Sequence, residues 1–210
     1  MGQRESAMVA LRREFTLYKW LLLFVIASWW VVEAIDTVLP GMTLDVFGIR
    51  PRTQAGLVGI LLAPFLHGGF QHVLNNSIGM LFLGGAVILR SVRDYVVVFL
   101  SAMFVGGLGV WLIAPSNSVH IGASGVVYGY LGYLLTTGWF ERKPLAIVLS
   151  VVAAVLWGGL LPGVLPGQPG ISWQGHLFGC LGGVLAASYL AKRAPAREAR
   201  PNGAGRAKSR

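Results

Sequence analysis

The stretch IGASGVVYGYLGYLL, residues 121–135, is apolar and rich in glycine, yet it contains one serine, Ser124. A second apolar stretch further along the chain contains one histidine, His176. Such side chains gain nothing from contact with hydrocarbon, so their presence in membrane helices indicates a functional site. The nearest chemistry for a serine and a histidine together is that of a Ser–His hydrolase that works inside a membrane.

The composition is that of an integral membrane protein with one domain. Of the 210 residues, 55% are apolar and only 12% are charged, and the apolar residues are gathered into runs. A helix needs roughly 20 apolar residues to cross a hydrocarbon core of about 30 Å. We therefore predict an all-α polytopic domain over residues 17–191, with six transmembrane helices near 17–37, 70–90, 94–113, 121–139, 144–161 and 173–191.

The apolar segment at 55–66 is ambiguous. It has 12 residues, contains Pro64 near its end and runs into the polar sequence HGGFQH at 67–72. A segment of this length is too short to cross the bilayer as a helix, and we interpret it as interfacial or re-entrant. The alternative is a seventh span.

Basic residues sort to one side of the six-helix arrangement. Fifteen of the 17 fall on that side, and only Arg50 and Arg52 fall on the other. Because cytoplasmic loops carry the excess of Lys and Arg, this pattern places both termini in the cytoplasm, and a seventh span would scramble it. Residues 1–16 are then a cytoplasmic N-terminal segment, and residues 192–210 are a basic, disordered cytoplasmic tail.

The two ends of the chain bear on its partners and location. We interpret the basic tail as a determinant of topology, with contact to anionic lipid headgroups as the alternative, and we expect no nucleic-acid partner. The first span is not a cleaved signal peptide, because its apolar run is long and no small-residue cleavage site follows it. The leader before it is too short for an organellar transit peptide plus an anchor, which favours a bacterial inner (plasma) membrane.

Three of the predicted helices enter the bilayer from the outer face, and each carries polar residues near its start. These residues are His72 and Asn76 in the helix at 70–90, Ser124 in the helix at 121–139 and His176 in the helix at 173–191. At a rise of 1.5 Å per residue they lie at similar depth, so three parallel helices can place them in one pocket.

Glycine spacing indicates how the serine and the histidine could meet. One helix face carries Gly122, Gly125, Gly129 and Gly132, and the helix with His176 carries a step of four residues at Gly175, Gly179 and Gly183. Such stripes allow two membrane helices to approach closely. Close packing would bring the short serine side chain within hydrogen-bonding reach of the imidazole.

Three motifs together resemble those of rhomboid intramembrane serine proteases. They are HGGFQHVLNNS at 67–77, GASGVVYG at 122–129 and GHLFGCLGG at 175–183, each opening a helix in this order, and the resemblance covers roughly residues 57–190. It implies a six-helix rhomboid-like bundle in which Ser124 is the nucleophile and His176 the general base. No Asp or Glu lies in the second, fourth or sixth predicted span, so these helices supply a dyad and no triad.

The resemblance also implies supporting roles. His72, Asn76 and the backbone N–H of Ser124 would bind the oxyanion, although a helix-to-helix hydrogen bond is the alternative for the two side chains. Tyr128 would pack against the catalytic imidazole, and His67 would have a structural role in the outer loop. Gly122, Gly125 and Gly179 belong to the motifs that hold the site together, whereas we interpret His120 as a loop residue without a part in it.

The resemblance implies single-span membrane proteins as substrates, cut near the outer face of the membrane. It departs from some members in the first outer loop, which reads FGIRPRTQ at 47–54 in place of a Trp-Arg pair. We expect no cofactor and no metal, because His67 and His72 are five residues apart and would point about 140° away from each other on a continuous helix. Cys180 is interpreted as a packing residue.

Two other classes of function were weighed against proteolysis. A non-proteolytic rhomboid-like protein that binds or dislocates transmembrane helices would share the glycine-rich helices, yet it would usually lack the serine or the histidine. A channel or transporter would place polar residues at mid-membrane and show repeated halves, which this sequence does not.

Overall fold

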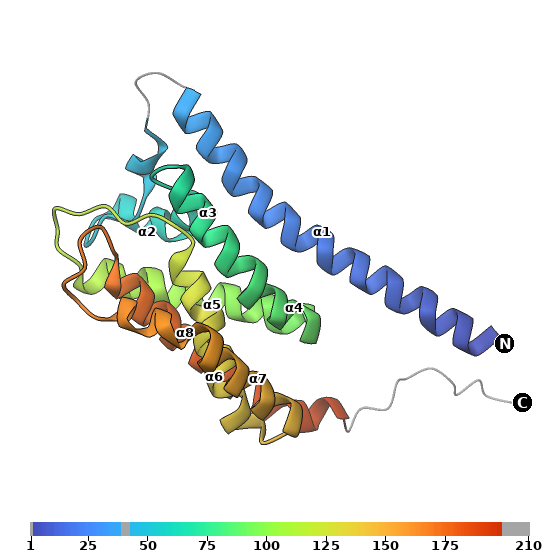
Figure 1. The fold of residues 1–210 in the computed structure, drawn as a ribbon. Helices are drawn as coiled ribbons and strands as arrows, with labels where there is room; N and C mark the ends of the chain where they lie inside the picture. Colours follow the sequence, from blue (N-terminus) through green and yellow to red (C-terminus); the bar gives the residue numbers. More distant parts are fainter. Residues whose placement is uncertain (1, 39–42, 199–210) are drawn as a thin grey trace, which may run out of the picture.

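The computed structural model describes residues 2–38 and 43–198. Within these residues the chain is helical, and its β pairing is limited to an isolated bridge between Ile49 and His120. The prediction of an all-α chain is therefore confirmed over the described part. The elements are α1 Gly2–Val38, η1 Leu44–Phe47, α2 Gln54–Leu62, η2 Ala63–Phe65, α3 Phe70–Gly79, the π-helical turn η3 Met80–Gly84, α4 Gly85–Arg90, α5 Val92–Ile113, α6 Ser124–Glu141, α7 Pro144–Trp157, η4 Gly158–Val164 and α8 Trp173–Glu198 (Figure 1).

Four helical segments are long and apolar enough to cross a membrane, namely Thr16–Val38, Phe70–Arg90, Val92–Ile113 and Pro144–Val164. They coincide with four of the six predicted spans. The other two, α6 and α8, are less apolar, since α6 contains Gly, Tyr and Thr residues and α8 contains Gly, Gln and His, and both helices pack extensively on other helices. Their passage through the membrane remains a prediction.

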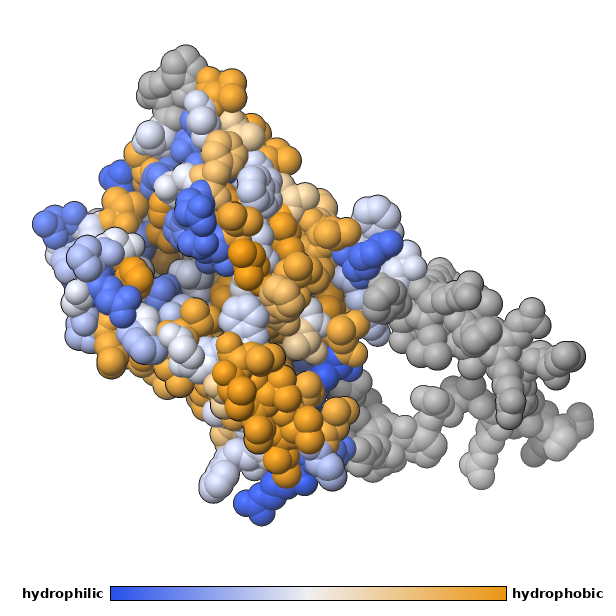
Figure 2. Space-filling view, viewed as in Figure 1, coloured by the Kyte–Doolittle hydropathy of each residue, from blue (hydrophilic) through white to orange (hydrophobic). Residues whose placement is uncertain are grey.

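The surface of the helical bundle is apolar along its sides. Among the most exposed apolar side chains are Phe24 of α1, Leu145 and Val155 of α7, and Leu185 of α8. Figure 2 shows a broad hydrophobic area where α7 lies in Figure 1. Hydrophilic residues gather at the left of the view, where the loops before α6 and α8 lie. Contiguous apolar surface of this extent needs a lipid covering, so the architecture is that of a multi-pass membrane protein.

The centre of the bundle is the packing of α6 on α8, which is more extensive than that of any other helix pair. A Cβ atom added at Gly179 would overlap the carbonyl oxygen of Gly125, and one added at Gly183 would overlap that of Gly129. The two glycine stripes therefore lie backbone to backbone, as their spacing predicted. On the other side of α8, the hydroxyl of Ser101 in α5 donates to the carbonyl of Gly182 at 2.8 Å.

Three helix ends differ most from the predicted ones. The first helix already begins at Gly2, so residues 2–16 of the predicted N-terminal segment are helical, and α8 continues to Glu198, past the predicted start of the tail at 192. Residues 199–210 lie outside the described residues. The helix with Ser124 begins at that residue instead of at 121, because Gly122 has a φ of +105° that does not fit a helix.

The ambiguous apolar segment forms α2 and η2, which together run from Gln54 to Phe65 and are too short to span a bilayer. They begin at a side-chain cap, in which the Thr53 hydroxyl accepts a hydrogen bond from Gly56 N–H at 3.0 Å. The Cβ position of Gly59 would overlap the carbonyl of Gly48, so the segment packs tightly against the loop at 47–54. Its place relative to the membrane remains a prediction.

Candidate active site

Ser124 is the first residue of α6, and His176 lies in the first turn of α8. The imidazole Nε2 and the serine Oγ are 2.8 Å apart, and the imidazole Nδ1 is 3.0 Å from the carbonyl oxygen of Gly163. A carbonyl can only accept, so Nδ1 carries the proton and Nε2 is left as an acceptor for the serine hydroxyl. The structure thus brings the predicted pair together in the protonation arrangement that a general base requires.

Tyr128 fixes the plane of this imidazole. Its ring stacks on that of His176 with 4.0 Å between centroids and 10° between planes. Its hydroxyl donates to the carbonyl of Leu160 at 2.7 Å. Leu160 and Gly163 both belong to η4, so this turn orients the histidine through one carbonyl and the tyrosine through another.

His72 and Asn76 of α3 lie beside the serine. A Cβ on Gly122 would be 2.6 Å from Nε2 of His72 and 3.6 Å from Nδ2 of Asn76, so only glycine fits between them and the serine loop. The Gly68 N–H donates to Nδ1 of His72 at 3.4 Å, which leaves its proton on Nε2, the side that faces Gly122. Nδ2 of Asn76 is buried without a hydrogen-bond partner among the described residues. Two donors therefore converge at one place.

His67 lies in the turn before α3 and not on the helix itself, which begins at Phe70. The predicted angle of 140° between His67 and His72 is therefore wrong, because it assumed a continuous helix. The two rings contact edge to face with 5.0 Å between centroids, and Trp29 of α1 lies 5.4 Å from the other side of His67. Burial, with a smaller contribution from His72, lowers the pKa of His67 to about 4.

The His67 ring thus contacts both Trp29 of α1 and the imidazole of His72, and its structural role stays a prediction. Among the described residues, no three His, Cys, Asp or Glu side chains gather in a group that could hold a metal ion. Cys180 is a free thiol, and its backbone and sulfur face Gly132 at the α6–α8 contact.

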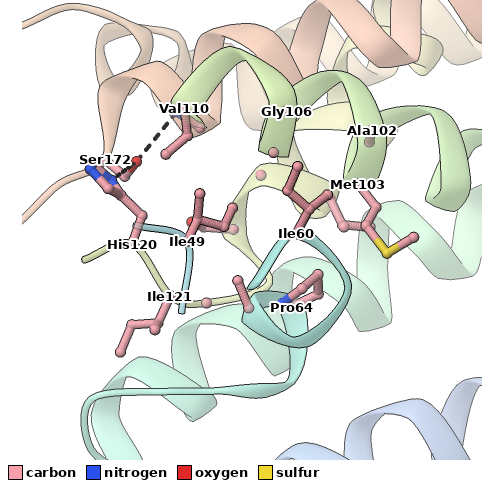
Figure 3. Close-up of a pocket in the computed structure, with 17 residues that line it drawn as sticks. Ile49, Ile60, Pro64, Ala102, Met103, Gly106, Val110, His120, Ile121 and Ser172 are labelled. Carbon is pink, nitrogen blue, oxygen red and sulfur yellow. Dashed lines mark hydrogen bonds between the residues drawn. The ribbon is translucent and has the colours of Figure 1, made fainter. Parts of the chain in front are cut away.

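Two cavities meet at Ser124. The larger has a volume of about 800 Å³, and its lining includes His72, Asn76 and His176 together with loop residues from 119–121 and 170–172. The smaller, of about 40 Å³, lies between α2, α5 and the serine loop and is lined mainly by apolar residues such as Ile60, Met103 and Val110 (Figure 3). The serine thus has a polar, roomy side and an apolar, narrow side.

His120 is the residue that the sequence interpretation underrated. Its Nε2 is 2.8 Å from Oγ of Ser118 and its Nδ1 is 2.7 Å from Oγ of Ser172, and it lines both cavities. Burial lowers its pKa. One signal in the sequence could have drawn attention to His120 and Ser172. His120 precedes Ser124 by four residues, and Ser172 precedes His176 by the same number.

The loop at 47–54, whose sequence departs from the Trp-Arg pattern, is anchored to the end of α5. The guanidinium of Arg52 donates to the carbonyl of Leu112 at 3.0 Å and to Oγ of Ser116 at 2.5 Å. The indole of Trp111 donates to the carbonyl of Thr53 at 2.8 Å. The loop also pairs its Ile49 backbone with His120, so it supports the segment that leads to the serine.

Comparisons with known proteins place the chain beside rhomboid proteins. A family model described as a rhomboid domain matches residues 54–193. An uncharacterized protein of Mycobacterium tuberculosis is 43% identical over 183 residues, which cover 83% of this chain and 75% of that protein. YdcA of Bacillus subtilis, named provisionally as a rhomboid protease, is 29% identical over 134 residues, which cover 60% of this chain and 63% of that protein. RHOMBOID-like protein 4 of Arabidopsis thaliana is 31% identical over 116 residues, which cover 50% of this chain and 28% of that protein.

Proposed function

The chain belongs to the rhomboid family, and on that premise we propose that it is an intramembrane serine endopeptidase with Ser124 and His176 as its catalytic dyad. The observation that carries the proposal is the 2.8 Å hydrogen bond between the serine Oγ and the imidazole Nε2. The Gly163 carbonyl supports it, because it holds the proton on Nδ1 and keeps Nε2 free to accept.

In the proposed reaction, Oγ of Ser124 attacks the carbonyl carbon of the scissile peptide bond while its proton moves to Nε2 of His176. The C–N bond then breaks, the imidazolium gives this proton to the leaving amine, and an acyl-enzyme remains on the serine. A water molecule, deprotonated by the same Nε2, attacks the ester and releases the new carboxyl group. The proton returns from the imidazolium to Oγ, and the dyad is restored.

The negative charge that develops on the substrate oxygen needs donors already in place. Nε2–H of His72 and the unpartnered Nδ2 of Asn76 lie beside Gly122. The N–H of Ser124 is a third donor, since the first N–H groups of a helix have no intrahelical acceptor. We assign these three groups to the oxyanion site.

Rhomboid proteins act on membrane-protein substrates within the lipid bilayer. We propose single-span proteins as the substrates here, cut near the outer face of a bacterial inner membrane. A cavity of about 800 Å³ at the helix ends supports this location, because it gives water and an extended peptide access to the serine. Six spans with both termini in the cytoplasm belong to the same proposal, and the sorting of 15 of the 17 basic residues to one side of the predicted spans supports them.

The decisive experiment uses the full chain purified in detergent with a model single-span substrate. We expect cleavage that needs neither metal nor ATP and is lost in Ser124→Ala and in His176→Ala. Ser28→Ala is the matched control, because the Ser28 hydroxyl donates to the Val25 carbonyl within α1, away from the site. A fluorophosphonate should label wild type and Ser28→Ala and leave Ser124→Ala unlabelled.

Cleavage by Ser124→Ala at the wild-type rate would falsify the mechanism. A folded wild-type protein that neither cleaves nor reacts with the probe would favour a non-proteolytic rhomboid-like binder. Topology has its own test: a reporter fused after Arg142 should be cytoplasmic, and an external signal would overturn the arrangement of six spans.

A further inference from the structure

His120 connects the two chain segments that precede Ser124 and His176. It lies four residues before Ser124, and its ring bonds Ser172, which lies four residues before His176. Figure 3 shows His120 and Ser172 side by side at the rim of the smaller cavity, joined by a hydrogen bond.

The protons of this cluster can be placed from its partners. The Ser118 hydroxyl donates to the Pro115 carbonyl at 2.5 Å, so its oxygen accepts from Nε2–H of His120 at 2.8 Å. Nδ1 of a neutral imidazole is then an acceptor, and it receives the Ser172 hydroxyl at 2.7 Å. The Ser172 oxygen in turn accepts the Gly175 N–H at 3.3 Å.

The chain of bonds therefore runs from the loop before α6 into the first turn of α8. Ser172 receives the N–H of Gly175, and its backbone carbonyl receives the N–H of His176 at 3.0 Å. Ser172 therefore forms hydrogen bonds both with the backbone of His176 and with the ring of His120. At its other end, His120 pairs with the Ile49 backbone through two hydrogen bonds of 2.9 and 3.0 Å, which fixes its own position.

From this geometry we propose that His120 is a positioning residue, which clamps the serine loop to the helix N-terminus that carries His176 and so sets the Oγ–Nε2 separation. The inference rests on the proposed function, because the separation matters only if the pair is catalytic. The glycine stripes set how closely α6 and α8 approach each other, whereas the hydrogen bond from Ser172 to His120 ties the first turn of α8 to the segment that leads to Ser124. A displacement of 1 Å at a reacting group can cost about 100-fold in rate.

Isosteric variants separate the clamp from simple packing. Asparagine places its amide where Nδ1 of histidine lies, so His120→Asn retains an acceptor for Ser172, whereas glutamine reaches the Nε2 position, so His120→Gln retains a donor for Ser118. We expect His120→Ala to lower kcat and the fluorophosphonate labelling rate of Ser124 by about 10-fold to 100-fold with little change in KM. We expect His120→Asn to recover most of this loss and His120→Gln little of it.

The matched control is Ser118→Ala, which removes the other arm and leaves the Ser172 cap of α8 in place. Its loss of rate should be smaller than that of His120→Ala. Thermal unfolding in detergent is measured for every variant, and if His120→Ala does not fold, the order of Asn above Gln still tests the clamp. Equal labelling rates for wild type and folded His120→Ala, or a rate for Gln at or above that for Asn, would overturn the inference.

These outcomes are separable from those that concern the dyad. An inactive Ser124→Ala together with a fully active His120→Ala leaves the protease proposal intact and removes the clamp. An active Ser124→Ala removes the protease proposal, whatever His120 does.

Discussion

The two ends of α6 both hold polar side chains inside the bundle, yet they differ in whether these side chains have hydrogen-bond partners. At the end with Glu141, no buried side-chain nitrogen or oxygen of the described residues lacks a partner: Arg90 donates to Glu141 at 2.5 Å and to Thr137 at 3.1 Å, and Tyr133 donates to Asp94 at 2.9 Å. At the end with Ser124, Asn76 has a buried donor without a partner. Glu141 follows Ser124 by 17 residues, about 25 Å along the helix.

The buried side-chain atoms without partners gather toward the serine end. Among the described residues they belong to Trp29, Glu33, His67 and Asn76. A buried polar group without a partner costs about 1–3 kcal/mol, so a protein retains it where something else is gained. A saturated network stabilises the fold, whereas donors that face a cavity are free to bind a charge that appears during a reaction.

The largest effect should come from removing the dyad. Ser124→Ala or His176→Ala should lower kcat/KM by at least about 10⁴-fold while the unfolding temperature stays close to that of wild type. The reason is that neither side chain belongs to the hydrogen-bond network around Arg90 and Glu141. The measurement is cleavage of a single-span substrate beside a thermal melt in detergent. A large drop in unfolding temperature would place these residues in the structural class instead.

Asn76 tests the unpartnered donor itself. We expect Asn76→Ala to lower kcat by about 10² to 10³-fold, because one donor to the oxyanion is lost. Stability should change little, because the folded protein no longer buries an unpaired amide. The adjacent variant Ser77→Ala is the control: the Ser77 hydroxyl donates to the Val73 carbonyl at 2.8 Å and accepts from Trp30, so it should affect stability and spare kcat. The reverse pattern would contradict the comparison.

How much of this arrangement the sequence could predict depends on where its signals reside. Ser124, His176 and the glycine stripes stand out because polar or small residues contrast with apolar neighbours, and the structure brings them together as expected. The carbonyls of Leu160 and Gly163 could not be predicted, since every residue has a carbonyl and no side chain marks these two.

Side-chain contacts between residues far apart in the sequence could not be predicted either. His120 and Ser172 are 52 positions apart, and although each lies four residues before Ser124 or His176, this spacing does not indicate that their side chains form a hydrogen bond. The helix ends were misjudged for a different reason. Hydropathy predicts where a helix enters lipid, but Ala, Lys, Arg and Glu continue a helix well past that point, as they do at both ends of this chain.

Substitutions at the Glu141 end of α6 should lower stability and spare the reactivity of Ser124, the opposite of what is expected at the Ser124 end. Arg90→Met leaves Glu141 partly buried without its cation, and we expect a loss of about 3 kcal/mol in the free energy of unfolding. The rate of fluorophosphonate labelling of Ser124, measured on the folded fraction, should stay near that of wild type. Arg93→Met, a change of the same chemistry three residues away, serves as the control and should cost less. A slower labelling rate in folded Arg90→Met would show that the two ends are coupled.

The glycine contact between the two ends can be tested by adding one methyl group. Gly183→Ala places a Cβ on the carbonyl oxygen of Gly129, so the helices must separate, and we expect a loss of about 2 kcal/mol in stability. Gly159→Ala is a matched control, because a Cβ there has no atom within 4 Å. If both variants melt at the same temperature, close packing of α6 on α8 does not contribute to stability.

The smallest expected effect concerns one hydroxyl at the serine end. Tyr128→Phe keeps the ring that stacks on His176 but loses the 2.7 Å hydrogen bond to the Leu160 carbonyl. We expect a loss of about 0.5–1.5 kcal/mol in stability and a fall in kcat of a few-fold, since the imidazole is still held by Gly163. Tyr128→Ala, which removes the stacking as well, should be clearly slower than Tyr128→Phe when both are labelled under the same conditions. Equal rates for the two variants would mean that the ring does not orient the base, and that the serine end relies on backbone carbonyls alone.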